Sequence, residues 1–453
     1  GKVRDYLAGF SMASSDFDIC APEPAEIFMK TALAAGFCAD AAYARTGTMK
    51  ISLRQNGDNE KNDIKTEAEY AAFRSDKYVR GTHTPAETFF TEDILLDARR
   101  RDFTCNAVYY DIVADTFVDP LGGMKDIRNK LLRTVDKPGK VFGEDGLRLL
   151  RLARFAGATG FSPTPETLDG AKNNAALIAD VSPERIFAEL KQILCSERKY
   201  GNADGIYQAL EILDETRVLD GIFPDLAAGR NLKQRADFHN HDVLEHSLRA
   251  AAYSARANAL ADVFPGVPVP FDVRLAALLH DIGKPAAYFR DGKFSDHPNV
   301  GAVLARVALE KLKAPVKTIK LVEALTKYHM YDYDLCTKEN KLRKFIVLHY
   351  DIFNELLLVK QADFSACKDD FSTAPGVTRL KNLADKMRAE GAPFTLKELA
   401  VRGNEIAPLL PSSRYVGATL EALLLHCAVT PADNTKERLL RLAPSFGIVG
   451  GKN

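Results

Sequence analysis

The chain has 453 residues, 46% of them hydrophobic, so it can bury several cores and more than one domain is expected. Basic and acidic residues balance at 61 each, which excludes a bulk polycation, so any nucleic acid must be held by local basic patches. Seven scattered cysteines without a C-x-x-C pattern exclude a disulfide framework and a zinc finger and favour the cytoplasm, and no apolar run approaches the ~18 residues that span a bilayer.

The first 140 residues mix strand-like and helical patterns. Residues 49–53 and 103–110 read as strands and residues 25–35 as a helix, which predicts a small α/β domain. From Glu144 onward nearly every segment has helical periodicity. The helices expected there include 183–194, 242–257, 273–280 and 353–362. The breaks rich in Gly and Pro, which are candidate boundaries, are 160–165, 264–271 and 391–394.

Two carboxylates stand two residues apart in Ser15-Asp16-Phe17-Asp18-Ile19. On a strand, residues with this spacing share one face. Such a pair can hold divalent metal against a nucleoside triphosphate, where the metal lowers the pKa of an attacking hydroxyl and steadies the leaving pyrophosphate. The alternative is a helix cap or a solvated turn. The pair therefore indicates nucleotidyl transfer only if other motifs accompany it.

Three more blocks follow in order: residues 100–107, Asp119-Pro120-Leu121-Gly122-Gly123 and residues 144–155. With the aspartate pair they closely resemble the class II tRNA nucleotidyltransferase and poly(A) polymerase family. The resemblance covers about residues 1–194 and continues more loosely through an HD phosphohydrolase-like region to about residue 367. It implies an α/β, polymerase β-like palm followed by an all-α body with an HD-type helical domain. Gly1 matches the second glycine of a family Gly-Gly pair, so we expect a segment upstream of it.

The resemblance also assigns roles to single residues of the polymerase site. It makes Asp16 and Asp18 ligands of Mg²⁺ and places Gly1 and Arg4 on the incoming triphosphate. It also implies that Arg101 holds phosphate. Glu69 is the candidate for the third catalytic carboxylate. Glu69 precedes an arginine by five residues, as in the family's Glu-x-Thr-Thr-x-Arg strand, although both threonines are alanine here. The alternatives are a surface basic cluster for Arg101 and a solvated strand residue for Glu69.

Asp145, Arg148, Arg151 and Arg154 recur every three residues, which predicts one ridge along a helix. Cytosine and adenine present an amino donor beside a ring-nitrogen acceptor, whereas uracil and guanine present a carbonyl beside a ring N–H. An accepting aspartate and a donating arginine therefore match C and A, so the protein would act as the template. Arg151 and Arg154 would contact phosphate or support the helix. The alternative is a surface ion pair between Asp145 and Arg148, worth ~0.3 kcal/mol.

A second candidate metal site follows the residue order of the HD superfamily: a His, then His-Asp, then an Asp at the end of an apolar helix. Gly283-Lys284 follows the His-Asp pair after one intervening residue. His297 and His329 are spaced like the extra histidines of two-metal HD sites. The resemblance implies a divalent metal that activates water on a phosphoester, whereas ordinary core histidines are the alternative. The four candidate ligands are His246, His280, Asp281 and Asp363.

The combined interpretation is a template-independent, CCA-adding tRNA nucleotidyltransferase that uses CTP, ATP and Mg²⁺ and is fused to an HD domain with its own divalent metal. The partners implied are the acceptor arm of tRNA and the two nucleotides, with neither DNA nor a membrane. The domains expected are a nucleotidyltransferase palm at 1–140, a helical neck with the nucleotide-selecting and RNA-binding helices at 141–230, an HD domain at 231–370 and a helical tail contacting tRNA at 371–453.

The nearest alternatives are a poly(A) polymerase and a CC-only or A-only enzyme, which share these motifs. Bacterial poly(A) polymerases carry a Gly-Arg-Arg-Phe-like segment, whereas Thr46-Gly47-Thr48-Met49 resembles the Gly-Thr-Val segment of CCA enzymes. Two alternatives come from other classes: an HD phosphohydrolase whose N-terminal domain only binds RNA, and a non-enzymatic RNA-binding protein. The intact aspartate pair argues against both, because a binding relic needs no metal ligands.

Overall fold

The computed structural model describes residues 1–11, 16–40, 46–55, 64–77, 87–256 and 269–447. The chain forms two compact units, one of Gly1–Ala227 with Lys311–Ala314 and the other of Ala228–Glu310 with Pro315–Asn453. All seven cysteines are free thiols. Among the described helices, none has both the length and the apolar character needed to cross a membrane.

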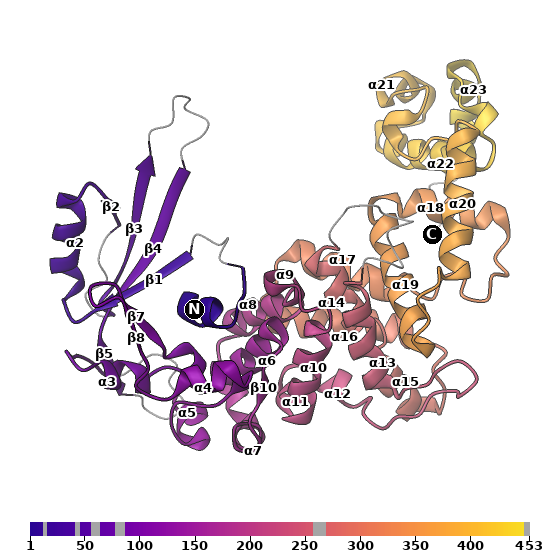
Figure 1. The fold of residues 1–453 in the computed structure, drawn as a ribbon. Helices are drawn as coiled ribbons and strands as arrows, with labels where there is room; N and C mark the ends of the chain where they lie inside the picture. Colours follow the sequence, from indigo (N-terminus) through magenta and orange to yellow (C-terminus); the bar gives the residue numbers. More distant parts are fainter. Residues whose placement is uncertain (12–15, 41–45, 56–63, 78–86, 257–268, 448–453) are drawn as a thin grey trace. The chain divides into compact units, whose positions relative to one another are not determined.

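The first unit contains a four-stranded sheet in the order β1-β4-β3-β2. Its strands are β1 (Asp16–Ala21), β4 (Ile64–Ala72), β3 (Thr48–Gln55) and β2 (Cys38–Ala39). Strand β1 runs parallel to β4, whereas β3 is antiparallel to both of its neighbours. The predicted helix at 25–35 is α2 (Ala25–Ala34), which lies against the sheet (Figure 1). The α/β expectation for this part of the chain is confirmed.

The sheet has one apolar and one acidic face, because residues alternate along each strand. The buried cluster against α2 consists of Ala25, Ala32, Met49, Ile51, Ala68, Tyr70 and Ala72. The ring of Tyr70 stacks on Phe28 of α2 with centroids 3.9 Å apart. Since successive strand residues point to opposite faces, Glu67 and Glu69 of β4 lie on the face away from α2. The fold therefore leaves one side of the sheet open and charged.

Short strands and helices complete the first unit. They are α1 (Lys2–Leu7), β5 (Arg74–Lys77), β6 (Glu87–Phe90), α3 (Ile94–Arg99), β7 (Tyr109–Asp111), β8 (Thr116–Val118), α4 (Gly123–Arg128) and β9 (Leu131–Leu132). The helical part that follows comprises α5 (Pro138–Glu144), α6 (Leu147–Thr159), α7 (Pro165–Asn173), α8 (Pro183–Ile193), α9 (Glu197–Tyr200), α10 (Gly205–Glu215), α11 (Val218–Ile222) and α12 (Pro224–Ala227), with β10 (Ser162–Pro163) pairing with β9.

The strand predicted at 103–110 is wrong over most of its length. A 3₁₀ turn occupies Thr104–Asn106, and β7 starts only at Tyr109. The side chain of Asp102 explains the difference, because it accepts the N–H of Phe103 at 2.8 Å and the amide of Asn106 at 3.0 Å. Aspartate that bonds its neighbours in this way offers the backbone an alternative to a strand ladder.

The motif at residues 119–123 has a structural role. Asp119 accepts the N–H groups of Gly123 and Met124 at 2.7 and 2.9 Å, at the start of α4. Gly122 has a φ of +75°, which favours glycine. A Cβ on Gly123 would lie 2.1 Å from the carbonyl oxygen of Thr104. The two glycines thus let α4 begin sharply and lie against the 3₁₀ turn.

The second unit is helical throughout its described part. Its main helices are α13 (Val243–Tyr253), α14 (Phe271–Leu279), α15 (Lys284–Asp291), α16 (His297–Lys311), α17 (Val316–Tyr328), α18 (Glu339–Leu348), α19 (Phe353–Lys368), α20 (Pro375–Ala389), α21 (Gly403–Ile406), α22 (Val416–Val429) and α23 (Lys436–Gly447). Helices α13, α14, α17 and α19 pack together, and α18, α20 and α22 enclose a separate core (Figure 1). Helix α19 continues past Asp363, so this aspartate lies within the helix rather than at its end.

Candidate active sites

Asp18 and Glu69 lie opposite each other on neighbouring parallel strands. The register pairs Asp18 with Glu69 and Asp16 with Glu67. The side chains of Asp18 and Glu69 are 64% and 57% exposed. Asp18 and Glu69 form a row of carboxylates across the two strands. Lys50 on β3 lies next in this row, with its Nζ 3.2 Å from the Oε1 atom of Glu69. Carboxylate oxygens are the ligands that Mg²⁺ and Mn²⁺ prefer, so the donors on this face fit a hard divalent cation.

Arg4 is buried rather than displayed on the surface. Its guanidinium forms an ion pair with Asp5 at 2.6 Å and donates to Asn106 Oδ1 at 2.6 Å and to the Tyr200 hydroxyl at 2.8 Å. Only 2% of Arg4 is exposed. The backbone nitrogen of Gly1, just ahead of α1, lies 3.8 Å from Asp18 Oδ2. The structure thus brings Gly1 to the carboxylate row and gives Arg4 three protein partners.

Arg101 lies beside Asp97, a buried carboxylate. Its Nη2 is 3.0 Å from Asp97 Oδ2, and its guanidinium stacks 4.8 Å from the ring of Tyr109. Burial opposes ionisation of Asp97, but Arg100 and Arg101 together hold its pKa below the usual range. The side chain of Arg101 is 25% exposed, and its three nitrogens donate to Asp97 and to the carbonyl oxygen of Asn106. An arginine held in place by a buried partner is well suited to bind phosphate.

A chain of hydrogen bonds links residues from three of the sequence motifs. Asn106 accepts from Arg4 and donates to Asp102 at 3.0 Å, while the other Asp102 oxygen pairs with Arg151 at 2.6 Å. Asp102 is buried, which opposes its ionisation, yet Arg151 and the hydrogen bonds of Asn106 hold its pKa well below the usual range. This network ties the positions of Arg4 and Arg151 to each other.

Three arginines surround the ring of Phe155. The guanidinium carbons of Arg4, Arg151 and Arg154 lie 5.2, 5.1 and 4.6 Å from its centroid. The side chains of Arg151 and Arg154 are 34% and 22% exposed, and Arg154 also pairs with Glu189 at 2.9 Å. Each of the three arginines pairs with a carboxylate, so a polyphosphate or RNA that binds here would compete with Asp5, Asp102 and Glu189 for these guanidinium groups.

Asp145 lies ahead of α6 and not on it, so the predicted ridge of four residues is wrong in its first member. Helix α5 ends at Glu144, and Asp145 has an extended backbone with φ −147°. Its Oδ1 accepts the N–H of Leu147 at 3.0 Å, and its Oδ2 lies 3.3 Å from Arg185. A carboxylate in this place satisfies an N–H at the helix start that no helical carbonyl reaches, which explains the break.

Arg148 is on α6 but is only 5% exposed. It donates to the carbonyl oxygens of Val141 and Arg100 at 2.9 and 2.7 Å and forms an ion pair with Glu144 at 2.9 Å. These contacts join α5, α6 and the end of α3. In the described structure Arg148 therefore holds the neck together, a role that the spacing of the motif did not indicate.

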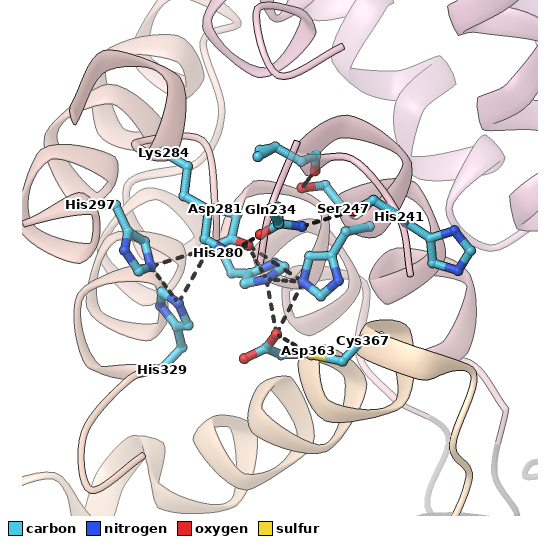
Figure 2. Close-up of polar contacts among 12 residues, drawn as sticks. Gln234, His241, Ser247, His280, Asp281, Lys284, His297, His329, Asp363 and Cys367 are labelled. Atoms are coloured by element: carbon cyan, nitrogen blue, oxygen red, sulfur yellow. Dashed lines mark hydrogen bonds and ion pairs between the residues drawn. The ribbon is translucent and has the colours of Figure 1, made fainter. Parts of the chain in front are cut away.

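The four HD candidates converge in the second unit, and all are buried. The Nε2 atom of His246 lies 3.1 Å from that of His280 and 3.1 Å from Asp363 Oδ1. His280 Nε2 is 3.2 Å from Asp281 Oδ2 (Figure 2). Helices α13 and α19 and the end of α14 supply these residues. Two imidazoles and two carboxylates at these distances fit a divalent transition metal.

The two extra histidines approach the other oxygen of Asp281. The Nε2 atoms of His297 and His329 lie 3.2 and 3.6 Å from Asp281 Oδ1 and 3.3 Å from each other (Figure 2). In both rings the Nδ1 atom is 2.7 Å from a carbonyl oxygen three residues earlier. A ring that donates from Nδ1 presents its Nε2 lone pair, so both are oriented as metal ligands are. Asp281 thus lies between two groups of donors.

Three residues around this centre, Gln234, His239 and Cys367, were missed by sequence reasoning, and Lys284 was noted only as part of the motif. Lys284 places its Nζ 2.6 Å from Asp281 and 2.6 Å from Gln234. The ring of His239 packs perpendicular to the ring of His246. Cys367 Sγ lies 3.9 Å from Asp363 Oδ1. Lys284 stands three residues after Asp281, and Cys367 stands four residues after Asp363. This spacing could have placed both side chains near the candidate metal ligands. Gln234 and His239 lie in an irregular segment, where no periodicity predicts what they contact.

Three family models match the chain. They are the poly A polymerase head domain at residues 1–133, the probable RNA and SrmB binding site of polymerase A at 160–229 and the HD domain at 243–363. The chain is 29% identical to an A-adding tRNA nucleotidyltransferase of Deinococcus radiodurans, over 99% of this chain and 91% of that protein. It is 33% identical to a multifunctional CCA protein of Stenotrophomonas maltophilia, over 59% of this chain and 63% of that protein.

Solved structures show the same fold. The CCA-adding enzyme of Bacillus stearothermophilus in complex with CTP aligns with a TM-score of 0.65 at 24% identity, over 99% of this chain and 92% of that one. A tRNA nucleotidyltransferase complexed with a primer tRNA and an incoming ATP analog aligns with a TM-score of 0.53 at 21% identity, over 87% of this chain and 95% of that one. The nucleotidyltransferase head and the HD domain both imply a divalent metal. The chain therefore carries a poly A polymerase head domain, the RNA-binding region that follows it in polymerase A, and an HD domain.

Proposed function

We propose that this protein adds C, C and A to the 3′ end of tRNA, using CTP, ATP and Mg²⁺. The strand register that sets Asp18 beside Glu69, on the face opposite α2, is the observation that carries the proposal. The named relatives add nucleotides to tRNA or carry CCA in their names, and one aligned enzyme was solved with CTP. These likenesses support the same substrates here.

The carboxylate face supplies the chemistry. Mg²⁺ held by Asp16, Asp18 and Glu69 would lower the pKa of the terminal hydroxyl of the tRNA and neutralise charge on the leaving pyrophosphate. Lys50 neutralises part of the charge on Glu69 before substrate arrives. The attacking oxygen bonds to the α-phosphorus as the bond to the pyrophosphate oxygen breaks, which extends the RNA by one nucleotide.

The arginines hold the phosphates. Arg101, Arg151 and Arg154 keep partly exposed guanidinium groups, which suits contacts to the triphosphate. Buried Arg4 acts through Asn106 and Asp102, since this chain of hydrogen bonds sets the position of Arg151. Gly1 is placed beside the triphosphate by its backbone nitrogen, which lies 3.8 Å from Asp18 Oδ2.

Asp145 and Arg148 are assigned the selection of the base. Arg148 is bonded to Val141, Arg100 and Glu144, so reading a base requires it to give up at least one of these partners. Asp145 must likewise turn from Arg185. Selection by these two residues therefore includes a local rearrangement between α5 and α6, in which the correct base replaces a protein partner.

The HD centre is proposed as a phosphohydrolase that acts on phosphate ends of RNA. A metal held by His246, His280, Asp281 and Asp363, with His297 and His329 on a second side, would activate water for attack on phosphorus. Lys284 lies against Asp281 and is placed to balance negative charge as the phosphoester is cleaved. Convergence of six donors from separate helices supports this proposal.

An A-adding enzyme is the second candidate, because the relative that matches 99% of the chain is named for A addition. In either case we propose a palm at 1–140, a neck at 141–230, an HD domain at 231–370 and a tRNA-contacting tail at 371–453. A cytoplasmic location belongs to the proposal, and the seven free thiols support it.

One assay separates these functions. The full chain is incubated with tRNA that lacks CCA, ends in CC or ends in CCA, with each labelled nucleotide alone and with CTP and ATP together. A CCA enzyme adds two C and then one A and stops. An A-adding enzyme extends only the CC end, and a poly(A) polymerase adds many A without CTP. Absence of incorporation on all three tRNAs would contradict the proposal.

A further inference from the structure

A second group of donors lies beside the HD centre and shares His246 with it, whereas its other two members have no part in the proposed hydrolysis. His239, His246 and Cys367 each offer one ligand atom, and these atoms lie within 4.8 Å of one another. His246 has no exposed surface, and its Nδ1 atom and that of His239 have no hydrogen-bond partner among the described residues. A buried imidazole nitrogen without a partner is costly, which points to a missing ligand.

The fold brings these residues together from three segments. His239 lies in the irregular segment before α13, His246 is on α13 and Cys367 is on α19. Cys367 follows Asp363 by one helical turn, so both side chains lie on the same face of α19, as Figure 2 shows. The Sγ atom is 3.9 Å from Asp363 Oδ1, which could serve as a fourth donor.

The donor types decide which cation suits the group. A thiolate and two imidazoles favour borderline-soft cations such as Zn²⁺ and Co²⁺, whereas Mg²⁺ and Ca²⁺ prefer oxygen. Bond lengths of about 2.0 to 2.3 Å in a tetrahedral zinc site put the ligand atoms roughly 3 to 4 Å apart. The separations here are close to that range, so small side-chain movements would close the site.

We propose that His239, His246 and Cys367 form a thiolate-containing cation site that shares His246 with the HD centre. When a cation binds, the thiol proton leaves to solvent and sulfur becomes a ligand. Because His246 also belongs to the HD centre, a soft cation bound by the second group would share this histidine with the HD metal or compete with it.

The test measures ligation and not turnover, so it is independent of the proposed hydrolysis. The full chain is stripped with a chelator and titrated with Co²⁺, and the near-ultraviolet charge-transfer absorption of a Co²⁺–thiolate bond is recorded. Wild-type protein should develop this band, and Cys367→Ser should lack it. The control Cys336→Ser changes an exposed cysteine of the same unit and should keep it.

Two further variants sharpen the result. His239→Gln should weaken formation of the band by at least roughly 10-fold in Co²⁺ concentration. His280→Ala removes a ligand of the HD centre but none of the three donors, so the band should persist. Wild-type protein that binds Co²⁺ without the band, or Cys367→Ser that retains it, would overturn the proposal. The wild-type measurement decides the question even if a variant fails to fold.

Discussion

Asp18 on β1 and Glu69 on β4 are register partners across a parallel strand pair, and Lys50 on β3 is the partner of Glu69 on its other side. The row of alternating charge lies on the face of the sheet opposite α2. Because partners in register share a face, the position of Glu69 follows from that of Asp18 once the strands pair. Although the family's Glu-x-Thr-Thr-x-Arg pattern reads Glu-Tyr-Ala-Ala-Phe-Arg in this chain, the register still sets Glu69 beside Asp18.

The first prediction separates Glu69 from its neighbour Glu67, which pairs with Asp16. Asp16→Ala and Asp18→Ala should lower nucleotide addition by at least roughly 100-fold while tRNA binding persists, because loss of a metal ligand costs several kcal/mol in the transition state. Glu69→Gln should lower kcat by roughly 10-fold or more, measured in single turnover. Glu67→Gln is the matched control. If Glu69→Gln and Glu67→Gln lower kcat equally, Glu69 is not the third catalytic carboxylate.

Alternation along a strand explains why Asp16 and Asp18 could be expected on one face. The HD candidates were instead found from the order of His, His-Asp and Asp along the chain. Other features depend on contacts between distant residues. The burial of Arg4 depends on Tyr200, 196 positions away. The placement of Arg148 depends on the carbonyl of Arg100, and the turn at 104–106 depends on Asp102 accepting local N–H groups. Residue spacing along the chain does not predict these partners, so the positions of the two arginines and of the turn became clear only from the tertiary structure.

The second prediction concerns the ion pair of buried Asp102 with partly exposed Arg151. Asp102→Ala should lower the free energy of unfolding of the first unit by about 1 to 2 kcal/mol, because it removes the partner of Arg151 and the acceptor of Asn106, while solvent screens part of the loss. The folded pKa of Asp102 is below its ordinary value, so the carboxylate stabilises the fold above that ordinary pKa. This stabilisation is lost as the pH falls towards the folded pKa. Urea unfolding from neutral pH down to about pH 3 should therefore show a shallower decline for Asp102→Asn than for wild type.

The third prediction concerns Gly283, two residues after Asp281 of the HD ligand pair. A Cβ there would lie 2.2 Å from the carbonyl oxygen of His297 and 2.5 Å from the nitrogen of Gly301. Gly283→Ala should push α16 away, cost about 1 to 3 kcal/mol of stability and weaken metal binding by displacing His297. Gly417→Ala, on a helix of the same unit with open space around the added carbon, is the control. An unchanged thermal midpoint for Gly283→Ala would mean that α16 is free to shift.

The fourth prediction separates the two chemistries. His280→Ala should remove metal-dependent phosphatase or cyclic phosphodiesterase activity and leave nucleotide addition nearly intact, because the two sites use different residues and different metals. Transition metal bound per chain, measured by elemental analysis after dialysis, should fall in the variant. A wild-type protein that holds no transition metal, or a folded His280→Ala variant that fails to extend tRNA, would contradict this separation.

The last prediction tests base selection while allowing for the structural role of Arg148. Truncating Arg148 leaves the acceptors of Val141, Arg100 and Glu144 without their donor, so Arg148→Ala should lose several kcal/mol of stability as well as its contact to the base. Loss of folded protein lowers the rate for every nucleotide by the same factor. The ratio of kcat/KM values between nucleotides cancels that factor and reports selection alone.

For Asp145→Ala and Arg148→Ala, the preference for CTP and ATP over UTP and GTP should fall by about one to two orders of magnitude, since each hydrogen bond to the correct base is worth ~1 to 3 kcal/mol. Arg154→Ala, which changes a side chain of the basic cluster around Phe155, should lower all four values together and serves as the control. The kcat/KM values are measured on tRNA ending before, within and after CC. Parallel losses with unchanged ratios in both variants would mean that Asp145 and Arg148 support the neck but do not read the base.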